Sequence, residues 1–143
     1  MKLHETQAKV AVDLHRFRVL CCGRRWGKTT LALDQLKALA GVRKSRIAYI
    51  APTYQQARDI AWEQLKNDLH SVGTINDSRL EITLVNGSKI FLRGWESIET
   101  LRGQQFDFLI LDEVAMMRNF WSHWQEILRP TLTDTKGEAL FIS

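Results

Sequence analysis

Long apolar runs, a cysteine framework and histidine clusters are all missing from this sequence of 143 residues. No apolar run reaches the ~18 residues of a membrane-spanning helix, and the first residues do not have the shape of a signal peptide, so we expect no contact with a membrane. The two cysteines, Cys21 and Cys22, are adjacent on an expected strand, where neighbouring side chains point to opposite faces. This arrangement predicts no disulfide and fits a reducing cytoplasm. The four histidines lack the spacing of metal ligands.

Repeats, low-complexity segments and linkers are lacking as well, so residues 1–143 are expected to form one domain or part of one. Nothing in the sequence suggests a serine or cysteine nucleophile triad. The fractions of apolar residues, 45%, and charged residues, 25%, are ordinary for a globular protein with a real core. The net charge of +4 fits contact with nucleic acid, but so mild an excess gives weak support.

What the sequence does contain is a stretch typical of a phosphate-binding loop. Its residues are Cys22-Gly23-Arg24-Arg25-Trp26-Gly27-Lys28-Thr29-Thr30. A short apolar strand is expected before it, at 18–22, and a strong helix pattern follows it, at 30–40. The pattern G-x-x-x-x-G-K-[ST] places its first glycine at Cys22, whereas the glycine here stands one residue later. The strand, loop and helix together predict nucleotide binding; an Arg-rich surface turn is the alternative.

The loop residues have distinct expected roles. A helix begins with unpaired N–H groups and the positive end of its dipole, so phosphate binds well there. Gly27 lets the backbone curl close to the phosphates, Lys28 reaches the β- and γ-phosphates, and the Thr29 hydroxyl binds Mg²⁺.

Two carboxylates complete the predicted site. Asp112 and Glu113 follow the apolar run Phe106–Leu111. In a doubly wound sheet, ligands gather at the carboxyl ends of the strands, which puts this pair at the same sheet edge as the loop. Asp112 is expected to hold Mg²⁺ beside Thr29, and Glu113 to deprotonate the attacking water. The alternative is that the pair only caps the next turn.

Periodicity and turn signals predict the remaining elements. In chain order these are a helix at 4–17, the loop helix ended by Gly41, a strand at 46–51, a helix at 54–69 with Thr53 as N-cap, a hairpin at 79–93 around Asn86-Gly87, a short helix at 95–102, a helix from Asn119 to Leu128 ended by Pro130, and a strand at 139–142. The order βαβα at the start predicts an α/β fold with a mainly parallel sheet. The stop directly after an expected buried strand suggests a domain truncated at its C-terminus.

These motifs resemble the ATPase domain of the large terminase subunit, the DNA-packaging motor of tailed bacteriophages, over nearly the whole chain. The segments that carry the resemblance are the variant phosphate loop Gly23–Thr30, the segment 51–57 after the second strand, Leu101-Arg102-Gly103, the Walker B region Phe106–Glu113, and Leu140-Phe141-Ile142-Ser143 at the start of the coupling motif. The resemblance implies a RecA-like P-loop fold with helices on both faces, a β-hairpin insertion and strand 139–142 between the loop strand and the Walker B strand. It also implies that the family's nuclease domain is absent, so no nuclease activity is expected.

Further site residues follow only from the resemblance. Gln7 would recognise adenine, Arg24 would contact the γ-phosphate, Arg102 would act as a finger on a neighbouring subunit, and Ser143 would sense hydrolysis. The ATP-binding set is then Gln7, Gly23, Arg24, Arg25, Trp26, Gly27, Lys28, Thr29 and Thr30. Each added residue has a plainer alternative: an ordinary helix glutamine for Gln7, a solvated charge for Arg24, and a salt bridge or helix-end charge for Arg102.

The resemblance implies Mg-ATP hydrolysis coupled to translocation of double-stranded DNA into a procapsid, in the cytoplasm of the bacterial host. The implied partners are the portal protein, the small terminase subunit and further copies of the chain in a ring. Two alternatives stay open. One is a helicase-like DNA-dependent ATPase, although no clear further helicase motif is found; the other is an inactive prophage remnant that only binds nucleotide.

Overall fold

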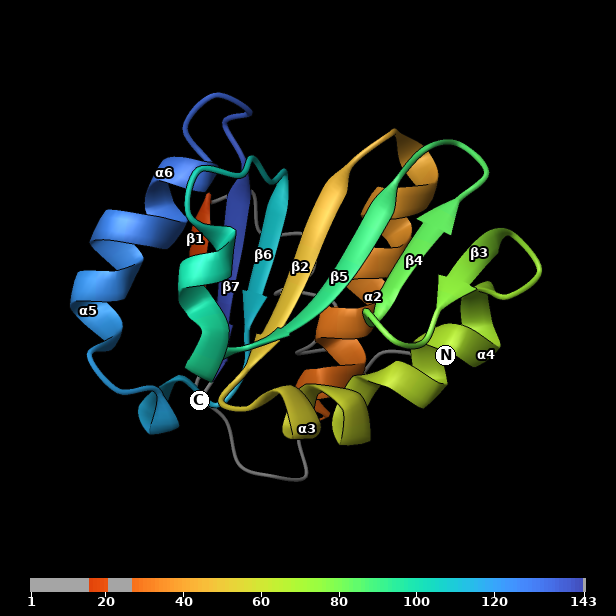
Figure 1. Ribbon diagram of the computed structural model, residues 1–143. Helices are drawn as coiled ribbons and strands as arrows, with labels where there is room; N and C mark the ends of the chain where they lie inside the picture. The colour runs from red at the N-terminus through yellow and green to blue at the C-terminus, as the bar shows by residue number, and fades with distance from the viewer. Residues whose placement is uncertain (1–15, 21–26, 143) are drawn as a thin grey trace.

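The architecture was analysed in a computed structural model that describes residues 16–20 and 27–142. Within these residues seven strands form one sheet, in the order β1-β7-β6-β2-β5-β4-β3 (Figure 1). The strands are β1 (Phe17–Leu20), β2 (Arg46–Ala51), β3 (Gly73–Asn76), β4 (Glu81–Leu84), β5 (Lys89–Gly94), β6 (Phe108–Leu111) and β7 (Glu138–Ile142). The first five strands of the spatial order run parallel, whereas β4 and β3 are antiparallel.

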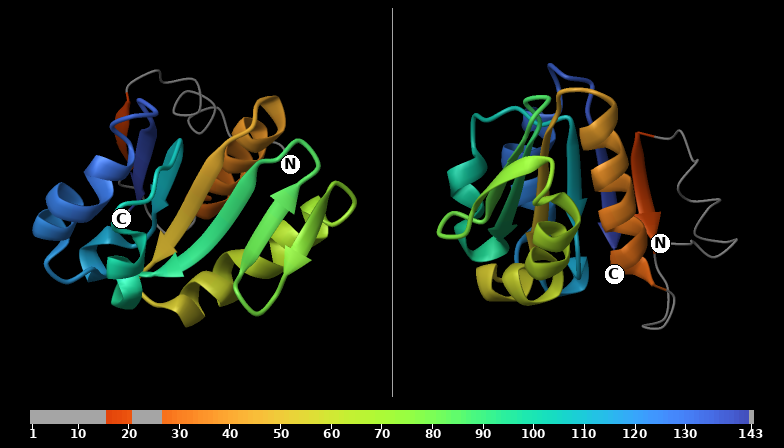
Figure 2. Two further views of the ribbon diagram at one scale, coloured as in Figure 1. Left: turned by 45° about the horizontal axis from the view of Figure 1, so that its top comes forward. Right: turned by 90° about the vertical axis from the view of Figure 1, so that its right-hand side faces the viewer.

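Helices cover both faces of the sheet, as predicted (Figure 2). One face carries α2 (Lys28–Val42) and a continuous helical segment made of α3 (Tyr54–Ala57), a π-helical turn (Arg58–Trp62) and α4 (Glu63–Leu69). The other face carries a 3₁₀ helix (Trp95–Leu101) and a segment made of α5 (Phe120–His123), a π-helical turn (Trp124–Leu128) and α6 (Arg129–Thr131). A short 3₁₀ turn (Val114–Met116) follows β6. No helix in the described part of the chain is long and apolar enough to cross a membrane.

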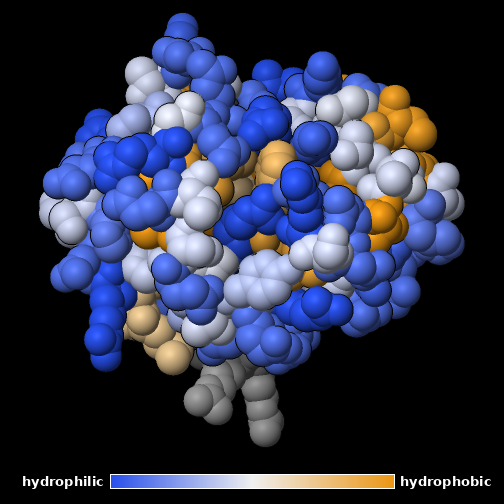
Figure 3. Space-filling view, viewed as in Figure 1, coloured by the Kyte–Doolittle hydropathy of each residue, from blue (hydrophilic) through white to orange (hydrophobic). Residues whose placement is uncertain are grey.

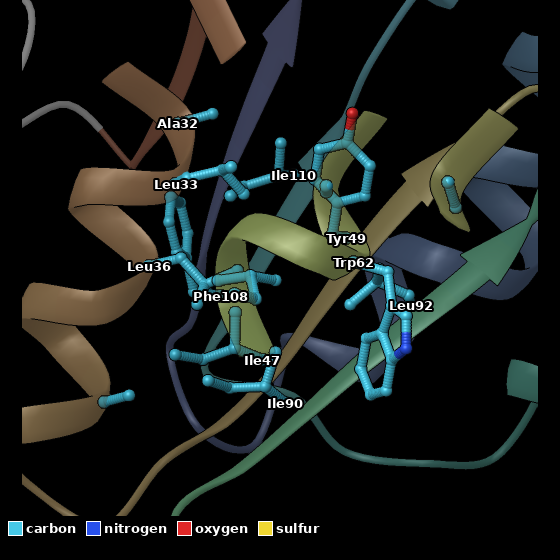
Figure 4. Close-up of a cluster of buried hydrophobic side chains, with 14 of the residues drawn as sticks. Ala32, Leu33, Leu36, Ile47, Tyr49, Trp62, Ile90, Leu92, Phe108 and Ile110 are labelled. Carbon is cyan, nitrogen blue, oxygen red and sulfur yellow. The ribbon is translucent and has the colours of Figure 1, made fainter. Parts of the chain in front are cut away.

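The central strand β2 shows how the sequence builds two cores. Ile47 and Tyr49 pack against α2 and α4 (Figure 4), while Ala48 and Ile50 pack against the opposite helices. Alternation follows from the two-residue period of a strand, and a parallel sheet covered on both faces needs apolar residues at both sets of positions. The molecular surface is mainly hydrophilic on the face seen in Figure 3, with smaller apolar patches.

The predicted order of the central strands is confirmed. β7 lies between β1 and β6, with Val19 opposite Phe141 and Leu111 opposite Phe141 on its other side. The hairpin is confirmed as β4–β5 with Gly87 at φ +92° in its turn. It is more than an insertion, because β5 pairs in parallel with β2 and extends the main sheet. The fold is therefore α/β with a mostly parallel sheet, as expected.

Two predicted helix boundaries in the first 42 residues are wrong. The loop helix does not end at Gly41: α2 continues to Val42, and its carbonyl at Ala40 accepts hydrogen bonds from Asn86 Nδ2 (2.7 Å) and Ser88 Oγ (2.8 Å). Side chains of the β4–β5 turn thus satisfy the helix end, and no left-handed glycine cap is needed. The helix expected at 4–17 lies outside the described residues up to 15, and Phe17 belongs to β1.

The signals around the last helical segment were also misread. Asn119 precedes α5 but makes no side-chain capping bond, because its backbone is left-handed at φ 52°. Pro130 does not end the helical segment by itself; α6 continues one residue further, to Thr131. By contrast, Thr53 caps α3 as predicted, since its Oγ1 accepts from the backbone N–H of Gln56 at 3.1 Å.

Candidate nucleotide-binding site

Among the described residues, the ones predicted to hold phosphate and Mg²⁺ meet at the edge of the sheet where the parallel strands end. Lys28 begins α2, and Asp112 directly follows β6. Figure 1 shows the start of α2 and the carboxyl ends of β2 and β6 at the same side of the molecule. Gly27 is the residue before the helix, with φ 79° and ψ 35°, a left-handed conformation that glycine adopts without strain. Its carbonyl accepts the first helical hydrogen bond, from Leu31 N at 3.1 Å.

Thr29 and Asp112 are in direct contact. The Thr29 hydroxyl donates to Asp112 Oδ2 over 3.4 Å, and Asp112 is 2% exposed. The Asp112 backbone N–H donates to Ile50 O at 2.8 Å, which fixes the residue to the end of β2. Hydroxyl and carboxylate oxygens are the ligands that Mg²⁺ prefers, and Mg²⁺ needs only one or two from the protein. These two side chains therefore fit a magnesium site, although the described residues contain no cluster of three metal-ligating groups.

Tyr49, on β2, also forms a hydrogen bond with Asp112. Its hydroxyl donates to the same oxygen, Asp112 Oδ2, at 2.5 Å. Burial is the main cause that raises the pKa of Tyr49 far above its usual value of 10.0, and the negative charge of Asp112 and its hydrogen bond add to the effect. Tyr49 therefore stays neutral and remains a donor, which holds the carboxylate in one orientation.

A pocket of about 470 Å³ opens beside this contact. Among the described residues it is lined by Gly27, Lys28, Thr29, Thr30, Gln56, Ile60, Glu113 and Met116. Its size lies in the range of small-molecule sites. Backbone N–H groups, an ammonium and a hydroxyl come from the start of α2, while the carboxylate of Glu113 comes from the end of β6. The arrangement suits a ligand that carries phosphates and a metal ion.

Glu113 has an unusual backbone. Its φ of 58° and ψ of 50° lie in the left-handed region, which is uncommon for any residue other than glycine, asparagine or aspartate. Such outliers cost about 1–3 kcal/mol and cluster at functional sites. The turn at Glu113 places its side chain at the pocket, one residue after the buried Asp112.

A second hollow, of about 520 Å³, has a different chemical character. Val19, Trp121, Trp124 and Phe141 are among its apolar lining residues, and Arg129 is the charged one. The described residues that line it offer neither a carboxylate nor a hydroxyl for a metal ion. Phosphate chemistry therefore points to the smaller pocket at the start of α2.

Comparison with known proteins shows the family of the chain. Residues 19–142 match the family described as the terminase large subunit, T4likevirus-type, N-terminal. The chain belongs to this family. The large terminase subunit of Escherichia phage T5 is 34% identical over 135 residues, which are 90% of this chain and 30% of that protein. The chain spans about a third of the length of the curated relatives that it matches.

Solved terminase structures share the fold. The ATPase domain of the Thermus phage P74-26 large terminase superposes with a TM-score of 0.86 at 28% identity, over 99% of this chain and 64% of that one. A large terminase from a thermophilic bacteriophage, solved in complex with ATP-gamma-S, has a TM-score of 0.76 at 16% identity, over 99% of this chain and 38% of that one. The RecA-like terminase ATPase fold expected from the sequence is thereby confirmed.

The terminase motifs fall partly outside the described residues. Gln7, Gly23, Arg24, Arg25, Trp26 and Ser143 lie there, so their expected roles stay predictions. Arg102 lies on the surface at the end of the 3₁₀ helix and is not among the described residues that line the pocket. It forms a bidentate pair with Glu99, with Nε–Oε2 at 2.9 Å and Nη2–Oε1 at 3.1 Å. Each partner reinforces the charge of the other: the pKa of Glu99 is lowered and that of Arg102 is raised.

Sequence reasoning missed four residues of this terminase site: Tyr49, Gln56, Ile60 and Met116. Tyr49 could have been noticed as the one side chain with a polar group between Ile47 and Ala51 on a strand expected to be buried. Gln56 stands three residues after the N-cap Thr53, the spacing of a capping box, and that pattern does not by itself reveal a pocket.

Proposed function

We propose that this chain is the ATPase part of a phage DNA-packaging motor, which binds Mg-ATP at the start of α2 and hydrolyses it. The observation that carries the proposal is the contact of Thr29 with Asp112 beside a pocket that Lys28 and Glu113 also line. A magnesium ligand pair, a phosphate-binding lysine and a general base are the parts that phosphoryl transfer to water needs. Membership of the terminase family supports the same conclusion.

The described residues have separate roles in the proposed reaction. Lys28 and the backbone N–H groups of the first turn of α2 hold the β- and γ-phosphates. Thr29 and Asp112 hold Mg²⁺, which neutralises charge that develops on the phosphates. Glu113 takes a proton from the water that attacks the γ-phosphate. Tyr49 keeps the Asp112 carboxylate oriented through its hydrogen bond.

Other roles in this proposal rest on the family alone. Gln7 recognises adenine, the loop residues 23–26 complete the phosphate site with Arg24 on the γ-phosphate, and Ser143 senses hydrolysis. Arg102 completes the site of a neighbouring subunit. Its half-exposed side chain and its absence from the described pocket lining support a role in trans, because a guanidinium at the rim can fork onto the phosphate of another copy.

The substrate and partners are proposed from the family as well. They are double-stranded DNA, the portal protein, the small terminase subunit and a homo-oligomeric ring, in the cytoplasm of the bacterial host. ATP hydrolysis stimulated by DNA without strand separation distinguishes this motor from a helicase-like ATPase. Nucleotide binding without turnover in a full-length, assembled protein would instead favour the inactive remnant.

Titration calorimetry with ADP and with ATP-gamma-S in the presence of Mg²⁺ tests the site. The wild-type chain is expected to bind both nucleotides, and Lys28→Ala is expected to bind neither. Lys37→Ala is the matched control, because Lys37 lies on the same helix but pairs with Asp68 at 2.7 Å away from the pocket. Unchanged affinity in Lys28→Ala, or equal loss in both variants, would place the nucleotide elsewhere.

A further inference from the structure

Gln56 lines the nucleotide pocket from the helical segment that follows β2. It shares the pocket with Lys28, Thr29 and Glu113, although it comes from a different element from all three. Its neighbour Gln55 points the other way: that side chain is exposed, and its Nε2 donates to Asp59 Oδ1 at 2.8 Å on the outer surface of the helix. The two adjacent glutamines therefore face different surroundings.

The contacts of Thr53 fix the orientation of the Gln56 amide. Thr53 Oγ1 accepts from the backbone N–H of Gln56 at 3.1 Å and donates its own proton to Gln56 Oε1 at 3.2 Å. The oxygen of the amide is thus held at the helix cap. The two N–H groups on Nε2 are left, and no described residue accepts a hydrogen bond from them.

The position of Glu113 shows which end of a bound nucleotide these donors meet. In the proposed function Glu113 activates the water that attacks the γ-phosphate, so the part of the pocket beside Glu113 is the γ-phosphate end. Lys28 and Thr29 line the same pocket and mark the β- and γ-phosphates. A neutral amide donor in this pocket supplies a hydrogen bond to a phosphate oxygen without a second cation.

We propose that Gln56 donates from Nε2 to the γ-phosphate of ATP and thereby distinguishes ATP from ADP. This inference rests on the proposed function, because it requires the phosphates to lie at the start of α2. ADP has no γ-phosphate and leaves these donors to water, so the contact contributes to ATP affinity only.

The test compares the affinities of Mg-ATP-gamma-S and Mg-ADP by titration calorimetry in wild type, Gln56→Ala and Gln56→Glu. A hydrogen bond to a charged group corresponds to about tenfold to a hundredfold in affinity. Both variants are expected to bind ATP-gamma-S that much more weakly and to bind ADP as wild type does. Gln56→Glu keeps an oxygen for Thr53, replaces the donor by an acceptor and adds a negative charge beside the γ-phosphate, so its loss of ATP-gamma-S affinity is expected to be at least as large as that of Gln56→Ala. A carboxylate suits the first turn of a helix, so this variant is expected to fold.

Gln55→Ala and Gln55→Glu are the matched controls, because they make the same changes one residue away on the exposed side. They are expected to leave the ratio of the two affinities unchanged. An equal loss for ATP-gamma-S and ADP in the Gln56 variants, or no loss for either, would overturn the γ-phosphate contact while wild-type binding still upholds the nucleotide site at the start of α2. A wild-type chain that binds neither nucleotide would overturn both proposals.

Discussion

Tyr49 and Asp112 are 63 residues apart in the sequence, and the hydroxyl of the first donates to the carboxylate of the second at 2.5 Å. One residue lies in the middle of β2, and the other follows the end of β6. Among the described residues, Asp112 Oδ2 therefore has two donors, Tyr49 and Thr29. The buried tyrosine fixes the orientation of Asp112, the proposed magnesium ligand. Removing the tyrosine hydroxyl leaves Asp112 in place but no longer holds its carboxylate in that orientation.

Tyr49→Phe is expected to weaken the Mg²⁺ dependence of nucleotide binding without abolishing binding. Loss of an outer partner of a metal ligand costs about tenfold to a hundredfold in metal affinity, and loss of a hydrogen bond to a charged group costs about 1.5–3 kcal/mol of stability. Mg²⁺ titration of ATP-gamma-S binding and denaturant unfolding measure the two effects. Tyr54→Phe is the control, since its hydroxyl donates to Ser78 O at the surface. Identical Mg²⁺ curves for both variants would contradict this role.

The raised pKa of Tyr49 predicts a loss of stability in alkali. The unfolded chain releases the tyrosine proton near pH 10, while the folded chain keeps it. The stabilisation from the neutral phenol is therefore full below pH 10 and falls as the pH rises above it. In Tyr54→Phe, which retains only Tyr49, tyrosinate absorbance is expected to appear together with unfolding. Tyrosinate formation in the native state near pH 10 would show that Tyr49 is accessible.

Glu113→Gln is expected to bind Mg-ATP with wild-type affinity and to hydrolyse it at least a hundredfold more slowly, because a general base contributes about 10²–10⁴ in rate. Asp112→Asn is the informative comparison, since it should raise the Mg²⁺ requirement instead. Both are to be measured by steady-state phosphate release in a full-length protein that forms the ring. Equal turnover of Glu113→Gln and wild type would remove Glu113 as the base.

Ser88→Ala is expected to destabilise the fold by about 1–3 kcal/mol, because it leaves the buried backbone N–H of Ser45 without its partner. The buried Ser88 hydroxyl donates toward Ala40 O (2.8 Å) and Arg43 O (3.0 Å), and accepts from Ser45 N (3.0 Å). Denaturant unfolding measures the effect. Ser122→Ala, at an exposed position, should change stability by less than about 0.5 kcal/mol. Similar losses in both variants would mean that the hydroxyl of Ser88 does not hold the end of α2.

Arg102 is tested by mixing two inactive variants of a full-length, ring-forming protein, Lys28→Ala and Arg102→Ala. ATPase activity is expected to return in the mixture, where one subunit keeps its loop and the next keeps its arginine. Such fingers contribute about 10³–10⁵ in rate, so recovery should be clear. Glu99→Ala tests the alternative role, since a plain Arg102–Glu99 pair would make both single variants equally harmless. If a mixture shown to co-assemble recovers no ATPase activity, the role of Arg102 in trans is contradicted.

Local sequence signals were sufficient for the parts of the fold that local chemistry decides. The alternation at Leu80, Ile82 and Leu84 revealed β4, and Thr53 revealed the start of α3. The strand β3 was missed because it lies at the sheet edge with no buried residue to mark its pattern. Gly41 was misread because the groups that cap α2 come from Asn86 and Ser88, far along the chain.

The candidate site likewise contains residues that the sequence predicted and residues that it did not. The pairing of Thr29 with Asp112 was expected because parallel strands end at one sheet edge, and the structure places them in contact. The contributions of Tyr49 and Gln56 depend on which neighbours their side chains meet, and strand or helix periodicity does not specify that. Both residues are visible only once β2 is placed beside β6 and the helix after it is capped.

The place of β7 in the sheet has a consequence for synthesis of the protein on the ribosome. Among the described strands β1 has β7 as its one neighbour, and Arg16 Nε reaches Gly137 O across 121 residues of sequence. A nascent chain that ends after β6 already contains Lys28, Thr29 and Asp112, yet β1 has no strand to pair with. Among the described residues, the strand that leads into the phosphate loop gains its neighbouring strand only after Glu138–Ile142 emerges, so sheet closure is a late, long-range event of the slow kind.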